Sequence, residues 1–188
     1  MGIFIQILLN SLEVGGVYAL AALGIILIFR TSITTNFAQG SISMFNAFAA
    51  TYILQFTGLP VPLVAVLGVM SAFVIGILVD RIVISKASRV SPVGKQIITL
   101  GLIMVFLGIA PMIFGTDPLQ FPRFAYGSMS LLGATISYNA ITNILIGIVI
   151  MLVLFYVIQK TRWGLAVRAT ASNEIVARMM GIPTSFIT

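Results

Sequence analysis

The stretch 141-ITNILIGIVIMLVLFYVI-158 decides the fold of this chain, because it holds no charged side chain from end to end. An uninterrupted apolar run of this length approaches the ~20 residues that an α-helix needs to cross the hydrocarbon core of a bilayer. Apolar and polar side chains do not alternate along it, which argues against a strand of a membrane barrel. The stretch therefore predicts a transmembrane helix.

Four other apolar runs repeat this pattern. The predicted spans cover residues 3–29, 41–57, 62–79, 97–115 and 141–158. Of the 188 residues, 60% are hydrophobic and only 7% are charged, whereas about a quarter of the residues of a soluble domain are charged. We predict an all-α integral membrane protein, a polytopic bundle of about five transmembrane helices that forms a single domain over residues 1–188.

The residue types that carry most enzyme chemistry are missing or scattered. The chain has no Cys and no His, which removes thiol nucleophiles and most zinc and haem sites. Its acids, Glu13, Asp80, Asp117 and Glu174, fall in different segments and form no obvious acid–base pair. The sequence has no GxxxxGKS or GxxxxGKT phosphate loop. We therefore expect no enzyme, no catalytic residue, no metal site and no cofactor in this chain.

Basic residues lie mostly on one side of the predicted spans. Nine of the 10 lysines and arginines follow the first, third or fifth span, and only Arg123 follows the fourth. Cytoplasmic loops are enriched in basic residues, which predicts an outer N-terminus and a cytoplasmic segment 159–188. Because these charges flank apolar runs, the net charge of +6 indicates contact with the lipid bilayer and no nucleic acid. The loop 116–139 then faces outside, where its prolines and glycines predict turns and room for a short interfacial helix.

The first predicted span is longer than a bilayer requires. Its 27 residues would form ~40 Å of helix against a hydrocarbon core of ~30 Å. Either the helix tilts, which places Glu13 near mid-membrane, or residues 3–9 lie in the interface and Glu13 is wetted. The sequence leaves both arrangements open.

Small residues at helical spacing predict close packing in the first and fourth spans. The first span carries Ser11, Gly15, Ala19 and Ala22, and the fourth carries Gly101, Gly108 and Gly115. Such stripes let helix backbones approach one another in lipid.

Polar side chains mark one face of the second predicted span. Gln39, Ser43 and Asn46 recur at i, i+4 and i+7, so they share a helix face. The segment NFAQG, which begins at Asn36 and ends at Gly40, comes directly before this span. A polar face in lipid must turn toward protein or toward a water-filled path. Two interpretations carry equal weight: these residues line a translocation path, or they hydrogen-bond between helices without touching a substrate.

The stretch 172-SNEIVARMMGIP-183 predicts a short helix outside the lipid. Ser172 or Asn173 can cap its start, and Gly181 is a helix stop. Glu174 and Arg178 are spaced for an ion pair. The predicted apolar face consists of Ile175, Val176, Met179 and Met180. This helix suits docking on a partner, but the residues alone also allow it to lie on the inner membrane surface or under its own bundle.

Several strings resemble one family. The loop 161-TRWGLAVRATASNEIVARMMGI-182 resembles the cytoplasmic loop of permease subunits in bacterial branched-chain amino acid ABC importers. The segment 36-NFAQGSISM-44 is similar to that family's NFAHG segment. The stretches 80-DRIVISKASRVSP-92 and 99-TLGLIMVFLGIAPMIFGTDPLQFP-122 resemble its first long cytoplasmic loop and its fourth helix. The resemblance covers nearly the whole chain in order.

The resemblance implies a single transmembrane permease domain with a cytoplasmic coupling loop over residues 159–188. It implies a bacterial inner membrane location, a second permease subunit, two cytoplasmic ATP-binding subunits that hold the ATP, and a periplasmic or lipoprotein substrate-binding protein. The loop match assigns ATPase coupling to Glu174, Ala177, Arg178 and Gly181, and the predicted apolar face adds Ile175 and Met179. The NFAQG match and the polar face of the second span place Asn36, Gln39, Gly40, Ser43 and Asn46 near the translocation path.

The chain departs from the family pattern at two places. Gln39 stands where the family usually has His, so a protonation role at this position is not expected. The family continues with further transmembrane helices after the loop, whereas this chain stops at Thr188. Three explanations of this early end stay open: the chain is a fragment, a truncated gene product or a divergent short form.

Two other functions remain beside an importer permease for branched-chain amino acids. A stand-alone channel or secondary transporter would need an intramembrane charge, for which Glu13 is the candidate. A truncated, non-transporting scaffold is the other. Relatives of the family that carry urea and other amides keep those substrates open as well.

Overall fold

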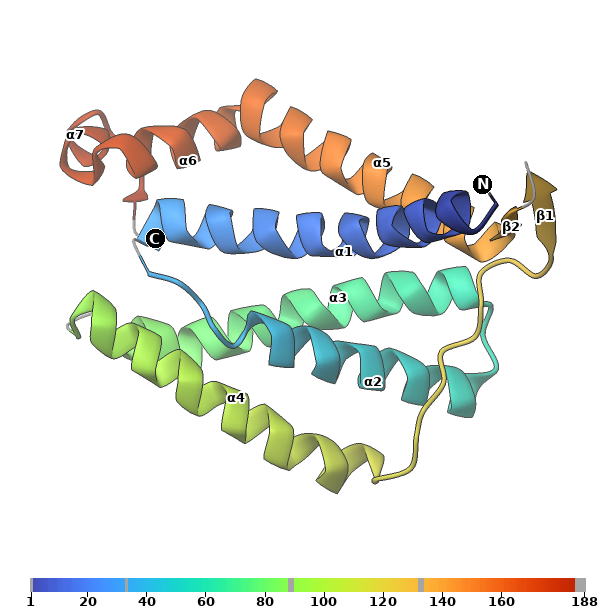
Figure 1. Ribbon diagram of the computed structural model, residues 1–188. Helices are drawn as coiled ribbons and strands as arrows, with labels where there is room; N and C mark the ends of the chain where they lie inside the picture. Colours follow the sequence, from blue (N-terminus) through green and yellow to red (C-terminus); the bar gives the residue numbers. More distant parts are fainter. Residues whose placement is uncertain (1, 33, 88–89, 132–133, 185–188) are drawn as a thin grey trace. The chain divides into compact units, whose positions relative to one another are not determined.

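The computed structural model describes residues 2–32, 34–87, 90–131 and 134–184 (Figure 1). The chain forms two compact units, which are treated separately below. One unit consists of residues 1–33 together with 125–188, and the other is the continuous segment 34–124. The N-terminal helix therefore belongs with the C-terminal third of the sequence.

The continuous unit is built from three long helices. Its elements are α2 (Gln39–Thr57), α3 (Val61–Val79), a π-helical turn η1 (Asp80–Ile84), a 3₁₀ turn η2 (Ser85–Ala87) and α4 (Pro92–Phe114). Proline in the first turn starts both α3 and α4, where its missing N–H has no helical partner to lose. Gly58, with φ of +60°, ends α2 in the left-handed conformation that glycine adopts without strain.

Helix α2 packs against both α3 and α4. On the α3 side, a Cβ built on Gly68 would lie 3.1 Å from the Cβ of Ala50, so the two backbones approach closely there. On the α4 side, the ring of Phe45 lies edge-on to Phe106 and Phe114, with centroids 5.3 and 5.1 Å away. Small residues thus join one pair of helices, and aromatic rings join the other.

The discontinuous unit contains helices at both ends of the chain and a hairpin. Its elements are α1 (Gly2–Ser32), β1 (Ser128–Leu131), β2 (Ala134–Ser137), α5 (Tyr138–Lys160), α6 (Arg162–Ser172) and α7 (Glu174–Met179). Helix α5 packs on α1, while α6 contacts α5, α1 and α7. At the other end of α1, the Gln6 side chain accepts a 2.7 Å hydrogen bond from the backbone N–H of Thr135 in β2.

The segment that predicted turns and a short interfacial helix contains a β-hairpin. Strands β1 and β2 pair antiparallel, with Ser128 opposite Ser137 and Leu131 opposite Ala134. The expected short helix is therefore wrong for the described residues of this loop. The reason is local: Met129, Leu131 and Ile136 alternate with small polar residues, which suits a half-covered strand better than a helix.

The predicted spans agree with the helices to within a few residues. Among the described residues, four helices are long and apolar enough to cross a membrane: Ile3–Arg30, Val61–Ala87, Pro92–Phe114 and Tyr138–Lys160. Helix α2 coincides with the predicted span 41–57, but its polar face keeps it out of this group. The all-α, polytopic fold is confirmed, and the expected number of spans is close to the number found.

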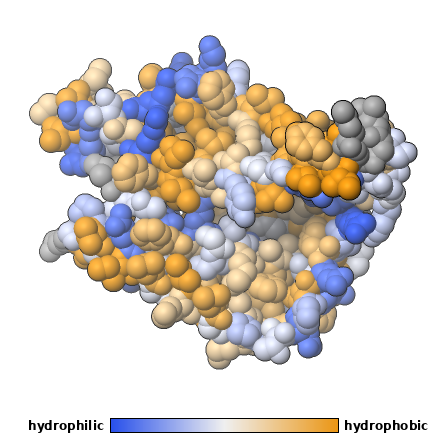
Figure 2. Space-filling view, viewed as in Figure 1, coloured by the Kyte–Doolittle hydropathy of each residue, from blue (hydrophilic) through white to orange (hydrophobic). Residues whose placement is uncertain are grey.

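The helices carry their apolar side chains outward. Large hydrophobic residues are exposed along α1, α3, α4 and α5, and Figure 2 shows broad hydrophobic areas on the visible surface. Surfaces of this kind are rare on soluble proteins. Outward apolar side chains are what helices in contact with lipid require, so the exposed surface agrees with the apolar composition.

Candidate functional site

The C-terminal loop folds into the short helix that the sequence predicts. The side chain of Asn173, not of Ser172, caps α7 by accepting a 3.1 Å hydrogen bond from the N–H of Val176. This bond satisfies one of the N–H groups that have no partner at a helix start. The beginning of α7 is thus fixed by its own neighbouring residue.

The other end of α7 is closed by a Schellman motif. The N–H of Gly181 donates to the carbonyl of Arg178, and the N–H of Ile182 donates to the carbonyl of Ala177, both at 3.1 Å. Gly181 has φ of +80°, a conformation that strains a residue with a side chain. The Gly-Ile pair at the end of the loop therefore has a structural function, since it stops the helix after two turns.

The two faces of α7 differ in exposure. Ala177 is 2% exposed and lies on the side of α7 that packs within the unit. By contrast, Ile175, Met179 and Met180 are 70%, 83% and 77% exposed. Glu174 and Arg178 form the predicted ion pair at 2.8 Å on the exposed surface. The helix therefore presents an uncovered apolar face with a charged rim.

Helix α6 joins this face to the membrane helix α5 through a tight corner. Thr161 ends α5 and begins α6, and its hydroxyl accepts the N–H of Gly164 at 3.1 Å. A Cβ at Gly164 would lie 2.5 Å from the carbonyl oxygen of Val157, closer than real Cβ contacts. Only glycine fits this position without moving one of the two helices.

Arg168, one turn after Gly164 in α6, stabilises the same α5–α6 corner. Its guanidinium donates to the side-chain oxygen of Gln159 at 3.0 Å and to the backbone carbonyl of Gln159 at 3.3 Å. The carbonyl belongs to the last turn of α5, where the chain direction changes. Sequence reasoning did not assign a role to Gly164 or Arg168, although both occur in the string that resembles the permease loop.

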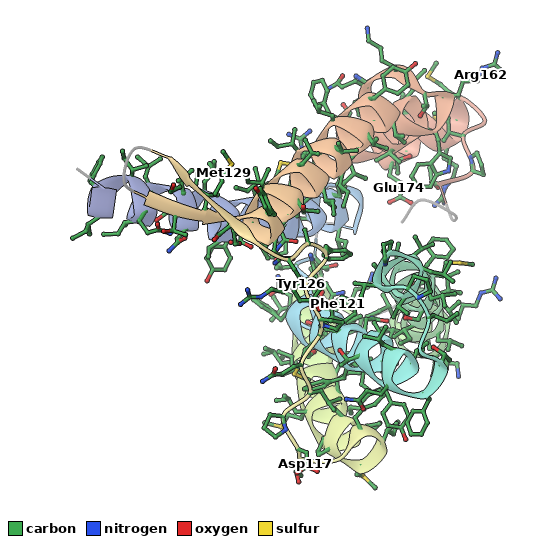
Figure 3. The ribbon with its side chains drawn as sticks, turned by 90° about the vertical axis from the view of Figure 1, so that its right-hand side faces the viewer. Asp117, Phe121, Tyr126, Met129, Arg162 and Glu174 are labelled. Carbon is green, nitrogen blue, oxygen red and sulfur yellow. The ribbon has the colours of Figure 1, made fainter. Side chains whose placement is uncertain are left out.

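The predicted coupling residues are brought together on one short element. Figure 3 shows Glu174 on α7 and Arg162 at the start of α6, at the end of α5 remote from Met129 in β1. Five of the six predicted positions lie within α7, and Gly181 closes it. The contacts made by these residues inside the chain leave their outer side chains available, and their coupling role stays a prediction.

The predicted path residues surround the start of α2. The side chain of Asn36 accepts the N–H of Ala38, and the NFAQG segment turns directly into the helix. Gly40 and Ser43 are exposed, and the Ser43 hydroxyl donates to the backbone carbonyl of Gln39 at 2.9 Å. These residues thus share one end of α2.

Asn46 occupies a different environment on the same helix. It is 7% exposed and accepts a 3.0 Å hydrogen bond from the hydroxyl of Ser71 on α3. Its amide N–H donates to the carbonyl of Ile42. Both ends of the side chain therefore have partners within α2 and α3, which is the interhelical hydrogen bonding considered as one interpretation of this polar face.

Glu13 joins the first and fifth helices. Its carboxylate accepts a 2.7 Å hydrogen bond from the side-chain amide of Asn143. Asn143 lies five residues after the first residue of α5, or about 8 Å along that helix. Glu13 thus meets α5 about halfway between the hairpin end and the middle of that helix, and its hydrogen-bond donor there is an amide, not a basic side chain.

Comparison with known proteins supports one assignment. The chain is 29% identical over 187 residues to the probable branched-chain amino acid transport permease protein LivH of Methanocaldococcus jannaschii, covering 94% of this chain and 58% of the relative. It is 28% identical over 198 aligned positions to the high-affinity branched-chain amino acid transport system permease protein BraD of Pseudomonas aeruginosa, covering 98% of this chain and 64% of the relative. The chain thus spans about three fifths of the length of these curated relatives. No solved structure matches it.

The family match extends from the first helix to the last residue. Residues 7–188 match the model of the permease component of branched-chain amino acid transport systems. The match includes the α5–α6 corner, α7 and the start of α2, so the resemblance seen in the separate strings is confirmed over residues 7–188. This chain belongs to the family of branched-chain amino acid transport system permease components.

Proposed function

We propose that the chain is a transmembrane permease subunit of an ATP-binding-cassette importer for branched-chain or related amino acids. The observation that carries the proposal is α7, a two-turn helix capped at both ends with Ile175 and Met179 exposed. Apolar side chains that are held rigidly in an exposed position favour association with a partner. Methionine side chains adapt well to such a groove.

The proposed partner of α7 is a cytoplasmic ATPase. The sequence contains no phosphate-binding loop of the Walker type, so energy from ATP must enter through another subunit. The corner at Gly164 and Arg168 joins α6 to α5, and α7 follows α6. A movement of a docked ATPase could therefore be transmitted through α6 to a membrane helix. The complete importer would contain a second permease subunit, two ATPases and a substrate-binding protein.

Reconstitution of the whole importer tests this function. The chain is combined in vesicles with the second permease, ATPase and binding-protein subunits encoded by neighbouring genes. We expect ATP-dependent uptake of radiolabelled leucine, and ATP hydrolysis that the loaded binding protein stimulates. Uptake that does not require ATP would identify a channel or secondary transporter. An assembled complex that takes up neither leucine nor urea would identify a scaffold.

The proposed orientation has the N-terminus outside and α6 and α7 in the cytoplasm, because nine of 10 basic residues fall on one side. Since the chain has no native cysteine, Ser85→Cys and Ser128→Cys provide unique exposed labels. In intact cells, we expect a membrane-impermeant maleimide to label Cys at 128, and we expect it to label Cys at 85 only after the cells are opened. Labelling of both positions before the cells are opened would contradict this topology.

The proposed translocation path runs beside the start of α2, near Asn36, Gln39, Gly40, Ser43 and Asn46. Ser43 is exposed, so Ser43→Leu is expected to lower leucine uptake severalfold without reducing the amount of assembled complex. Gln55→Leu is the matched control, because Gln55 is an exposed polar residue near the other end of α2. Equal uptake by the Ser43 and Gln55 variants would show that Ser43 does not line the translocation path.

Asn46 is proposed to support this region through its bond to Ser71. Asn46→Leu removes both side-chain hydrogen bonds of Asn46, and an interhelical hydrogen bond in a membrane contributes about 0.6 kcal/mol on average. A lower midpoint of thermal unfolding in detergent with unchanged leucine uptake would assign Asn46 to packing, whereas lower uptake with an unchanged midpoint would assign it to the substrate path.

A further inference from the structure

The cytoplasmic-loop end of α5 carries an apolar groove beside two basic residues. The groove has a volume of about 450 Å³ and is lined by Leu152, Val153, Phe155, Tyr156, Gln159 and Lys160. Its lining comes from the last turns of α5 alone, so it opens sideways from a membrane-spanning helix. The apolar side chains lie toward the membrane, and Lys160 lies at the end of the span.

The basic residues at this end have no acidic partner in the described chain. Lys160 is the last residue of α5 and Arg162 is the first residue of α6, and both are exposed. Of the two acids in this unit, Glu174 pairs with Arg178 and Glu13 hydrogen-bonds to Asn143. The two positive charges therefore remain uncompensated beside the groove.

Aromatic side chains stand next to the same charges. Tyr156 is 64% exposed within the groove, and Trp163, which follows Arg162, is 67% exposed. Tyrosine and tryptophan are enriched at the level of lipid headgroups, because one part of the ring is apolar and another part forms hydrogen bonds. Their position marks this end of α5 as the boundary between hydrocarbon and headgroups.

We propose that this surface is a binding site for an anionic phospholipid. An acyl chain lies in the groove along Leu152 and Phe155, and the headgroup phosphate is bound by Lys160 and Arg162. The groove matches a hydrocarbon chain in polarity, and the two basic side chains complement a net negative headgroup. The site goes beyond the proposed transport function, since it requires neither an ATPase nor a substrate.

The choice of an anionic lipid follows from the two uncompensated charges. A zwitterionic headgroup offers a phosphate together with a cation, so its net attraction to two neighbouring basic residues is smaller. Basic residues near an anionic membrane surface each strengthen binding about fivefold. Because the site flanks the α5–α6 corner, a lipid bound there would contact the element that carries α7.

Trp163 supplies a direct test, because it is the only tryptophan in the chain. The full chain is reconstituted in vesicles of phosphatidylcholine, in which a small fraction of lipid is brominated phosphatidylglycerol or brominated phosphatidylcholine. We expect brominated phosphatidylglycerol to quench Trp163 fluorescence more strongly, with an apparent association constant at least fivefold higher. Added salt should reduce this preference.

A double substitution and a matched control assign the preference to the site. Lys160→Gln with Arg162→Gln keeps Trp163 and should bring the two lipids to within about twofold of each other. Lys86→Gln removes one exposed positive charge in the other unit and should leave the preference unchanged. Three results would overturn the proposal: equal quenching by both lipids in the unmodified chain, a preference that survives the double substitution, or no quenching at all, which would place Trp163 away from lipid.

Discussion

Replacing Met179 with aspartate is expected to abolish copurification of the ATPase and the stimulation of ATP hydrolysis by loaded binding protein. Met179 is 83% exposed, so the substitution leaves the fold of the free chain intact. Docking would bury this side chain and that of Ile175, and each fully buried apolar side chain contributes about 1.5–3 kcal/mol. An aspartate in the same groove would lose this contribution and place an unpaired carboxylate away from water.

Arg178→Ala is the control for this substitution. It removes a charge from the same short helix together with the exposed ion pair to Glu174, and exposed ion pairs contribute about 0–1 kcal/mol. We expect a small loss of ATPase binding for Arg178→Ala and a complete loss for Met179→Asp, measured in the same assembled importer. Normal ATPase binding and stimulation in the Met179 variant would show that α7 lies on the membrane surface or under its own helices.

Gly164→Ala is expected to have the second large effect, although it adds a single methyl group. The new Cβ would overlap the backbone of Val157 and Ile158 in the last turn of α5, and a backbone cannot yield as a flexible side chain can. Forcing an extra group into a packed site costs about 1–3 kcal/mol. The corner must open to relieve the overlap, which would also pull Arg168 from Gln159.

Thermal unfolding in detergent measures this cost, with the fluorescence of neighbouring Trp163 as a local probe. Gly101→Ala is the matched control, because nothing in the described chain lies within 4 Å of a Cβ built at that position. Alanine is favoured over glycine in a helix by about 0.5–1 kcal/mol, so the control should be unchanged or more stable. A Gly164 variant as stable as the Gly101 variant would mean that the corner adjusts freely.

The difference between these two glycines explains what the sequence can predict. Gly101 and Gly108 repeat every seven residues and predict a packing face, yet a Cβ at either position meets no atom in the described chain. The close approaches between two helices occur at Gly68 and Gly164, which belong to no such stripe. The spacing of small residues in the sequence shows which of them share a helix face. Whether a second helix packs against that face depends on the three-dimensional arrangement of the two helices.

Features that depend on neighbouring residues were predicted well. The cap at Asn173, the stop at Gly181 and the Glu174–Arg178 pair each involve residues within a few positions of one another. The spans were predicted because burial in lipid requires long apolar runs regardless of how helices pack. The polar face of α2 allowed an interhelical hydrogen bond at Asn46, but no local pattern indicated that Ser71 is its partner or that Arg168 binds Gln159, because these partners lie on separate helices.

The bond between Glu13 and Asn143 also constrains how the chain is made. The two residues are 130 positions apart, with the whole continuous unit between them. At about 5–20 residues per second of translation, Asn143 follows Glu13 by on the order of ten seconds. During that interval the first helix has left the ribosome with an acid that lacks its final partner, while the three helices of the other unit are already synthesised. Helix α1 therefore lacks this interhelical hydrogen bond until the start of α5 has been synthesised.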